Sequence, residues 1–252
     1  MIANIVQNAK KVNRPLPGMG VWLDASQPNT LWVNDGIANV QNNGDLVYRW
    51  DDISGNGRNA YTANSLANPA WFKPVNNQSK MAAVSFNGVS NSMVGPWMPI
   101  FNTFTMYVLS KHRSGGDTDY ASIFYLGNHN QGGMGCGRRL GWQYATLFGM
   151  IAVGDFYYGV SGGYESLIIR FSGANYNYIN NTALFINGSN VSNIWISRFI
   201  PPQVGYSLAA LNGGTTNFAD IEIGEVLMYG QSHSDTEILY MSKYLREKWG
   251  TP

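Results

Sequence analysis

The sequence predicts an all-β protein, in which two antiparallel sheets pack as a sandwich or jelly roll and one short helix follows at the C-terminus. After residue 20, short segments rich in β-branched and aromatic residues recur, and Gly and Asn pairs separate them every ~8–12 residues. Only the residues after 233 combine a helix start signal, an apolar stripe and a stop signal. With 252 residues, 44% of them hydrophobic, the chain can bury the core of one such domain.

The predicted strands are the segments in which residues of high strand propensity run together. They are 81–86, 103–111, 121–126, 142–148, 165–171, 183–186, 193–198, 206–211 and 218–229. The strongest hairpin signal is the pair Asn187 and Gly188, because Asn-Gly suits the left-handed backbone of a type I′ turn. By contrast, the Gly-rich stretch 132–139 is predicted to be a flexible loop.

The last predicted strand, 218–229, alternates apolar and polar residues and then breaks its own period. Strict alternation would place Glu225 in the core beside Ile223. A bulge at Gly224 would instead return Val226 and Met228 to the core, and this is the interpretation we prefer.

The C-terminal helix has signals at both ends. Ser234 and Glu237 form a capping box, and Gly250 follows the last helical residue as a stop. Basic residues occur late in the helix, where the negative end of its dipole lies. Four apolar residues recur on one face, which is expected to pack on a sheet: Ile238, Met241, Leu245 and Trp249.

Charge and composition exclude several classes of protein. The chain has 16 Lys and Arg and 15 Asp and Glu, which gives a net charge of +1. This balance argues against a nucleic-acid partner, which selects for clustered cations. A lone Cys136 cannot form an internal disulfide. The N-terminus lacks the continuous apolar stretch of a signal peptide, and no apolar run is long enough for membrane insertion. Synthesis in a reducing cytoplasm is therefore expected.

Residues 1–20 differ from the rest and are predicted to be an anchoring arm, followed by one domain over 21–252. The arm is polar, rich in Asn and interrupted by Pro15 and Pro17, so an ordered arm needs a partner to offset its entropy. The alternative is an arm that folds back along its own domain. The predicted anchor residues are apolar or basic: Ile2, Ile5, Val6, Lys10, Lys11 and Arg14.

The order of several motifs resembles the concanavalin A-like, laminin G-like domain family. At the start these are VWLDAS (21–26), RWDDISGNGRNA (49–60), AAVSFNGVSNSM (82–93) and FTMYVLS (104–110). At the end they are LFING (184–188) and IGEVLMYGQSHSDTEILYMSKYLREKWG (223–250). The resemblance covers about residues 20–250 and implies a concanavalin A-like jelly-roll sandwich.

The resemblance also implies a range of functions, because this fold carries lectins, glycanases, adhesion modules and virion proteins. Such domains occur in bacteriophage virion proteins. We therefore expect a non-enzymatic virion structural protein, either a decoration protein or a receptor-binding component of capsid or tail. Its expected partners are other virion proteins, its own protomers and surface glycans. The alternatives are a free carbohydrate-binding module and, third, a glycan hydrolase.

No cofactor and no metal site are expected. Family members that bind calcium carry acidic residues after the Phe-x-Gly turn, whereas 87–91 here reads Asn-Gly-Val-Ser-Asn. Calcium favours several oxygen ligands with carboxylates among them, so this stretch is a poor site. Asp51 and Asp52 are open to two interpretations, calcium ligands or caps of backbone N–H groups in a turn, and we prefer the second.

No catalytic residues are predicted. A retaining glycanase needs two carboxyl groups ~5–5.5 Å apart, and Asp220, Glu222 and Glu225 are the nearest approach to such a pattern. Asp220 and Glu222 would share the outward face of the last strand. We interpret them as solvated surface carboxylates.

Aromatic residues in the middle of the chain are the remaining candidates for a binding site. Sugar rings stack their C–H faces on Trp and Tyr, while amide and carboxylate groups orient the hydroxyls. A protein surface of this kind is aromatic, rich in Asn and weakly charged, as this composition is. The glycan-binding candidates lie beside Gly-rich segments: Trp142, Tyr144, Tyr157 and Tyr158.

Overall fold

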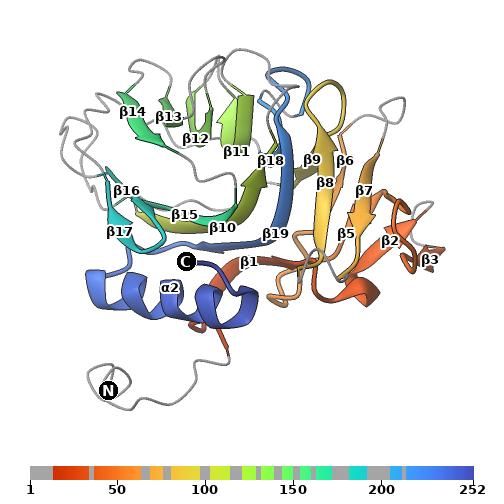
Figure 1. Ribbon diagram of the computed structural model, residues 1–252, viewed down its shortest axis with the longest axis horizontal. Coiled ribbons are helices and arrows are strands. Elements are labelled where there is room, and N and C mark those ends of the chain that lie inside the picture. Colours follow the sequence, from red (N-terminus) through yellow and green to blue (C-terminus); the bar gives the residue numbers. More distant parts are fainter. Residues whose placement is uncertain are drawn as a thin grey trace.

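Two antiparallel sheets face each other, and an α-helix near the C-terminus lies across the outer face of one of them (Figure 1). This computed structural model describes residues 14–33, 37–63, 69–75, 81–96, 103–113, 121–128, 132–138, 144–149, 154–159, 163–171, 182–191, 205–211 and 214–252. The structure describes the backbone but not the side chains of residues 128, 132–135, 137–138, 144–149, 154–159 and 182. The predicted all-β fold with a C-terminal helix is confirmed.

The first sheet, sheet A, has the last strand of the chain near its centre. On one side β19 pairs with β10; on the other side its two halves pair with β8 and with β1. In spatial order the strands are β17 (Ser189–Asn190), β16 (Thr182–Ile186), β15 (Tyr164–Phe171), β10 (Phe104–His112), β19 (Asp220–Tyr229), β8 (Ala83–Asn87), β7 (Ala70–Lys73) and β4 (Leu46–Val47), with β1 (Met19–Asp24) beside β19.

The second sheet, sheet B, covers the inner face of sheet A. Its strands, in spatial order, are β14 (Gly154–Gly159), β13 (Tyr144–Gly149), β12 (Gly132–Arg138), β11 (Ala121–Asn128), β18 (Tyr206–Leu208), β9 (Met93–Gly95), β6 (Ala60–Thr62), β5 (Arg49–Trp50), β2 (Leu31–Val33) and β3 (Ala38–Asn39). In the part of the chain that the structure describes, the helical segments are the 3-10 turn η1 (Pro28–Thr30) and the helix α2 (Asp235–Trp249).

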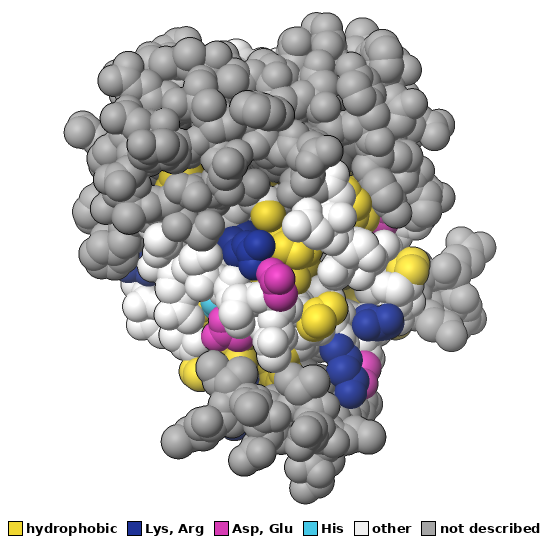
Figure 2. All heavy atoms as spheres, turned by 90° about the vertical axis from the view of Figure 1, so that its left-hand side faces the viewer, with side chains coloured by type: hydrophobic (Ala, Val, Ile, Leu, Met, Phe, Trp, Pro, Cys, Tyr) yellow, Lys and Arg dark blue, Asp and Glu magenta, His cyan; other side chains and the backbone are white. Residues whose placement is uncertain are grey.

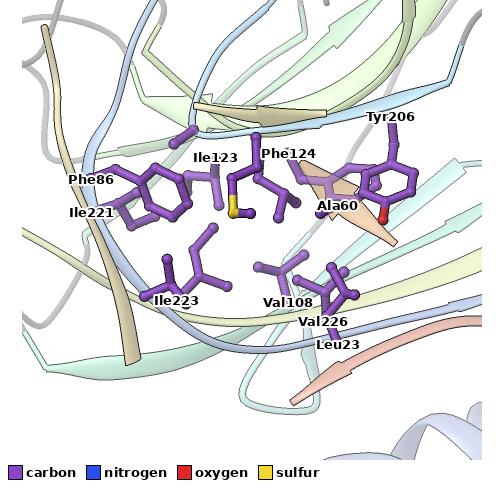
Figure 3. Packing of buried hydrophobic residues seen from close by; sticks show 14 of the residues in the cluster. Leu23, Ala60, Phe86, Val108, Ile123, Phe124, Tyr206, Ile221, Ile223 and Val226 are labelled. Atoms are coloured by element: carbon purple, nitrogen blue, oxygen red, sulfur yellow. The ribbon is translucent and has the colours of Figure 1, made fainter. Parts of the chain in front are cut away.

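The core lies between the sheets and is filled by the inward residues of both (Figure 3). Val108, Ile223 and Val226 extend from sheet A toward Ile123 and Phe124 of sheet B. Alternation along the strands directs side chains to the core, and irregularities in β11 and β19 shift its phase, so that the adjacent Ile123 and Phe124 both face sheet A. Burial of this apolar surface is the main favourable term in folding.

Gly224 produces the predicted bulge in β19. Opposite β10, Leu109 pairs with Glu225 and Ser110 pairs with Ile223, so Gly224 is the extra residue. Val226 and Met228 consequently belong to the core, as expected. Glu225 is turned to the outer face, toward α2.

The outer face of sheet A is covered by α2, and the apolar stripe of the helix makes a second hydrophobic layer there. The capping box is present, since the Ser234 hydroxyl accepts from Glu237 N–H and the Glu237 carboxylate accepts from Ser234 N–H. Gly250 ends the helix in the left-handed conformation (φ 68°). The residues predicted to face the sheet are buried: Ile238, Met241, Leu245 and Trp249.

The Asn187–Gly188 turn is confirmed as the hairpin between β16 and β17. Both residues have positive φ, 50° and 83°, which is the backbone of a type I′ turn. The Asn187 side-chain oxygen also accepts the Ser166 N–H at 2.9 Å, which ties the turn to β15.

One expectation about local structure needs correction, and another falls outside the described residues. The Gly-rich stretch at 132–139 is not a flexible loop, because 132–138 forms β12 and pairs with strands on both sides. Cross-strand hydrogen bonds outweigh the weak strand propensity of glycine here. The predicted strand 193–198 lies outside the described residues.

Cys136 of β12 is fully buried. Burial raises the pKa of its thiol to about 12, so the thiol stays protonated at neutral pH.

The chain before β1 contacts its own domain from Arg14 onward. Leu16 packs against the layer under α2, and its carbonyl accepts from the Tyr229 hydroxyl at 3.0 Å. The Arg14 carbonyl accepts from the Tyr240 hydroxyl of α2 at 3.2 Å. Ile2, Ile5, Val6, Lys10 and Lys11 lie outside the described residues. The division of the chain at residue 20 stays a prediction.

A buried carboxylate joins the first strand, the last strand and the helix. Glu225 is fully buried, and its Oε1 accepts from Trp22 Nε1 of β1 at 2.7 Å and from the Tyr244 hydroxyl at 2.8 Å. Its Oε2 accepts from Trp249 Nε1 at the end of α2. A buried carboxylate is tolerated only where donors satisfy it, so these three side chains are held in place together.

Lys248 supplies the positive charge of the same cluster. Its Nζ lies 3.0 Å from Glu225 Oε2 and 2.6 Å from Asp24 Oδ2 of β1. The ammonium group also lies near the rings of Trp22, Tyr244 and Trp249, with the Trp249 ring centroid 4.9 Å away. We call Asp24, Glu225 and Lys248 the Lys248 triad.

A buried histidine lies where the chain passes from β19 to α2. His233 Nδ1 is 2.7 Å from the Tyr107 hydroxyl, and its ring lies 4.3 Å from the Tyr229 ring. Its backbone N–H donates to Thr105 Oγ1. Burial lowers the pKa of His233 from its usual 6.5 to about 4, while the charge of Glu237 opposes this shift.

The His233 pKa predicts a pH dependence of stability. Between about pH 6.5 and pH 4 the unfolded chain binds a proton that the folded chain does not, so the free energy of unfolding falls as the pH falls. In the variant His233→Gln this contribution disappears. Urea unfolding of both proteins from pH 7 to pH 4 measures the difference, and identical slopes for wild type and variant would contradict the prediction.

Candidate functional site

A row of side chains crosses the outer face of sheet B at its β3 end. Pairing places Asn39 beside Trp32, Trp32 beside Arg49, Arg49 beside Tyr61, and Tyr61 beside Val94. We call these five residues the Tyr61 row. Because neighbouring strands lie ~4.8 Å apart, their side chains form a continuous surface.

Alternation within four very short strands produces this row. Four of its residues each follow or precede a core residue in the strand, so they point to the opposite face. The core residues concerned are Leu31, Trp50, Ala60 and Met93. The inward residues thus anchor the strands in the core, and the outward residues form the outer surface of sheet B.

Trp32, Arg49 and Asp51 hold one another in fixed orientations. The Arg49 guanidinium carbon lies 4.5 Å from the Trp32 ring centroid, and the Trp32 Nε1 donates to Asp51 Oδ2 at 2.6 Å. Arg49 Nε lies 2.8 Å from Asp51 Oδ1. An indole, a guanidinium and a carboxylate are therefore ordered before any ligand arrives, which reduces the entropy cost of binding.

Tyr61 is the most exposed member of the row. Its relative exposure is 43%, whereas Trp32, Arg49, Asp51 and Val94 are half-buried. The exposed phenol ring offers an apolar face with a polar end. The adjacent Arg49–Asp51 pair offers a donor and an acceptor without net charge. Together they can take a ligand with an apolar face and several hydroxyl groups.

The glycan-binding candidates from the sequence are located only in part. Tyr144 belongs to β13, and Tyr157 and Tyr158 belong to β14, the neighbouring strand at the far edge of sheet B. Their side chains, and Trp142 as a whole, lie outside the described residues. Sugar stacking by these residues stays a prediction.

Sequence reasoning missed the Tyr61 row. Its strands are two to three residues long, too short for a detectable alternation, and the row needs pairing between segments up to 33 positions apart, from Tyr61 to Val94. The only local signals were Trp32 beside Leu31 and Arg49 beside Trp50, where a core residue adjoins an outward one.

Asp220 and Glu222 share the outer face of sheet A, as predicted, but both form ion pairs, and Glu222 is buried. Arg113 binds Asp220 and also lies 3.5 Å from Glu222 Oε1. Glu222 is 6% exposed and accepts from Lys73 and from the Tyr164 hydroxyl. The expectation of solvated carboxylates was wrong for Glu222, because alternation gives the direction of a side chain and not what covers it.

The same contacts decide what Glu222 can do. Burial alone would raise the pKa of its carboxyl, but hydrogen bonds from Lys73 and Tyr164 and the charges of Lys73 and Arg113 outweigh burial and lower it. A glycosidase acid needs a raised pKa. Glu225 lies in the cluster under α2 and is occupied by its own donors. These carboxylates are therefore poorly suited to an acid–nucleophile pair.

The turn at 51–58 follows the second of its two interpretations. Asp52 Oδ1 accepts from the N–H groups of Trp22 and Ser54, and Oδ2 accepts from the Ser54 hydroxyl and the Arg58 N–H. All four distances are 2.8 or 2.9 Å. Asp52 thus caps backbone groups, and Asp51 pairs with Arg49 and Trp32.

An amide organises the 87–91 turn. Asn87 Oδ1 accepts from the N–H groups of Val89, Ser90 and Asn91 at 3.0–3.1 Å. Asn91 returns a contact through its Oδ1, which accepts from Asn87 N–H. Among the described residues, no group of three His, Cys, Asp or Glu side chains converges as metal ligands would.

Surface charge is mixed where the structure describes it. On the face shown in Figure 2, acidic and basic side chains lie close together among hydrophobic and uncharged ones. This distribution agrees with the net charge of +1. Among the described residues, no helix is long and apolar enough to cross a bilayer.

Solved structures share this fold at low sequence identity. Domain 4 of AbnA, a GH43 extracellular arabinanase from Geobacillus stearothermophilus, in complex with arabinotriose, has a TM-score of 0.62 and 10% identity, over 89% of this chain and 98% of that one. A Trypanosoma rangeli sialidase in complex with sialic acid has a TM-score of 0.63 and 14% identity. The match covers 93% of this chain and 34% of the sialidase, so the chain spans about a third of that enzyme.

A third neighbour is the receptor-binding domain of botulinum neurotoxin type G, with a TM-score of 0.56 and 13% identity over 90% of this chain and 51% of that one. No protein-family model and no curated protein matches the sequence. At these identities the likeness shows the fold alone, a β-sandwich of two antiparallel sheets.

The structural neighbours contradict the expectation of a non-enzymatic protein. Both the sialidase and the arabinanase are enzymes, and a domain with this fold forms part of each. The expectation rested on missing carboxylate pairs and triads, but a fold does not specify the chemistry that it carries. The unsuitable carboxylates of β19 are therefore no ground for calling the chain non-enzymatic.

The contacts of Asp52 and Asn87 predict that folding is independent of calcium. Protein donors already occupy the oxygens that a cation would need, so calcium should not stabilise the native state by mass action. Melting curves recorded after chelation and again after addition of millimolar calcium should coincide. A rise in melting temperature of several degrees would show a site in this chain that these turns do not reveal.

Proposed function

We propose that this chain is a glycan-binding β-sandwich domain whose binding surface is the Tyr61 row. The observation that carries the proposal is an exposed tyrosine ring directly beside an ordered, charge-compensated Arg–Asp pair. Binding sites commonly combine an apolar face with a small number of fixed polar groups.

The chemistry of the row matches a sugar with a C–H face and adjacent hydroxyls. The Tyr61 ring receives the C–H face, while Arg49 donates to one hydroxyl and Asp51 accepts from another. Trp32 does not stack on the ligand with the face that Arg49 covers; it orients the guanidinium instead. Tyr61 therefore contributes most of the contact area, and Arg49 and Asp51 contribute orientation.

The structural neighbours support a sugar ligand. The arabinanase domain is matched over 98% of its length, and its structure holds arabinotriose. The sialidase holds sialic acid, although the match covers a third of that chain. The row itself carries no net charge at Arg49 and Asp51, which favours a neutral glycan over an acidic one.

Replacing Tyr61 tests this surface. Tyr61→Ala removes the exposed ring and is expected to weaken glycan binding roughly tenfold, whereas Tyr61→Phe keeps the ring and most of the affinity. Leu239→Ala removes another exposed apolar side chain, from α2 and away from sheet B, and serves as the matched control. Titration calorimetry with the best ligand of a glycan array measures the affinities. Equal affinities for wild type and Tyr61→Ala would show that the Tyr61 row is not the glycan-binding surface.

The place of action is the second part of the proposal. We place the domain on a bacteriophage particle, as a receptor-binding or decoration component, on the strength of the motifs that resemble the concanavalin A-like, laminin G-like family. The predicted anchoring arm is the element that would attach it. A free carbohydrate-binding module is the alternative, which a protein found only in solution would favour.

A truncation tests the arm. Because Leu16 packs on the domain, deletion of residues 1–13 is expected to leave the melting temperature unchanged, while deletion of 1–17 lowers it. If the arm is an anchor, the shorter deletion abolishes oligomerisation or incorporation into particles. Light scattering measures the oligomeric state, and the protein composition of purified particles measures incorporation. Normal assembly by the protein lacking residues 1–13 would contradict an anchoring role.

A further inference from the structure

The Lys248 triad brings an amine and two carboxyl groups together from three separate elements. Asp24 ends β1, Glu225 lies in β19, and Lys248 belongs to the last turn of α2. Lys248 Nζ is 2.6 Å from Asp24 Oδ2 and 3.0 Å from Glu225 Oε2. Lys248 Nζ thus contacts Asp24 Oδ2, and Oδ2 is bonded directly to Asp24 Cγ, the carboxyl carbon.

The surroundings of the triad largely exclude water. The side chains of Asp24 and Glu225 are 2% and 0% exposed, and that of Lys248 is 21% exposed. Three aromatic rings surround the ammonium group, those of Trp22, Tyr244 and Trp249. Charges are costly in such a place, whereas an amide formed from the same two groups is neutral.

We propose that Lys248 and Asp24 condense to form an isopeptide bond between α2 and β1, with Glu225 as the group that transfers the protons. The reaction is intramolecular, so the groups react at a high effective concentration once the domain has folded. It requires no oxidant, reductant or further reactant.

The atoms of this step balance as follows. A bond forms between Lys248 Nζ and Asp24 Cγ, and the bond between Asp24 Cγ and Oδ2 breaks. The ammonium group loses two protons, which Glu225 Oε2 receives one at a time and passes to the departing Oδ2. One water molecule leaves, one amide N–H remains, and no atom changes its oxidation state.

The donors of Ser26 and the burial of Glu225 assist this step. Asp24 Oδ1, which becomes the amide oxygen, accepts from the Ser26 N–H at 2.9 Å and from the Ser26 hydroxyl at 2.6 Å. These donors stabilise the negative charge that develops on that oxygen during attack. Burial raises the pKa of the Glu225 carboxyl against the opposing charge of Lys248, which favours its taking up a proton from the amine.

The bond would close a loop that contains almost the whole domain, from residue 24 to residue 248. A covalent link across a long loop restricts the unfolded chain and so raises stability. It would also join the first strand directly to the last helix. Pulling on either end of the chain would then be resisted by a covalent bond in addition to strand pairing.

Mass spectrometry of the full-length protein tests the proposal. The intact mass is expected to be lower than the sequence mass by one water molecule, and a digest should contain one branched peptide that joins Asp24 to Lys248. Lys248→Arg keeps the positive charge and should restore the full mass, as should Glu225→Gln. Lys243→Arg, on the same helix and paired with Glu247, is the matched control and should keep the loss of water.

Wild-type protein in which the peptides containing Asp24 and Lys248 are separate and of full mass would overturn the proposal and leave an ion pair. A loss of water that persists in Lys248→Arg would overturn it as well. If Glu225→Gln folds and still contains the branched peptide, the role assigned to Glu225 is wrong. If Glu225→Gln does not fold, the wild-type peptides and Lys248→Arg decide the question.

Discussion

The rest of the structure depends on the burial of Glu225. A fully buried carboxylate must be satisfied by nearby donors, and here they come from β1, through Trp22, and from α2, through Tyr244 and Trp249. The bulge at Gly224 makes this possible, because it turns Glu225 from the core to the face that α2 covers. One inserted residue thereby sets the inward contacts of the last strand and the docking of the helix.

Trp22 of β1 connects the Glu225 cluster to the turn beside the candidate binding surface. The indole of Trp22 donates to Glu225, while its backbone N–H donates to Asp52 Oδ1 and its carbonyl accepts from Ile53 N–H. Asp52 organises the turn that follows β5. The neighbouring Asp51 holds Arg49 and Trp32. Side chains on the outer faces of the two sheets are thus positioned by contacts of one strand of sheet A, β1.

Side-chain surroundings account for most of the differences between expectation and structure. Asp220 and Glu222 do share a face, but Arg113, which follows β10, and Lys73 and Tyr164 of other strands contact them and form a compact cluster with these carboxylates. The Tyr61 row is of the same kind, since its members come from five short strands. Periodicity predicts the direction of a side chain and is silent about its neighbours.

By itself the sequence determined the elements with strong local signals. These are the capped helix after Ser234, the type I′ hairpin at Asn187 and the bulge at Gly224, because each depends on the backbone preferences of a few adjacent residues. Only the tertiary structure decided which residues form the Tyr61 row and the Lys248 triad. Both are built by pairing between distant segments, Asp24 with Lys248 being 224 positions apart, and no local preference encodes such proximity.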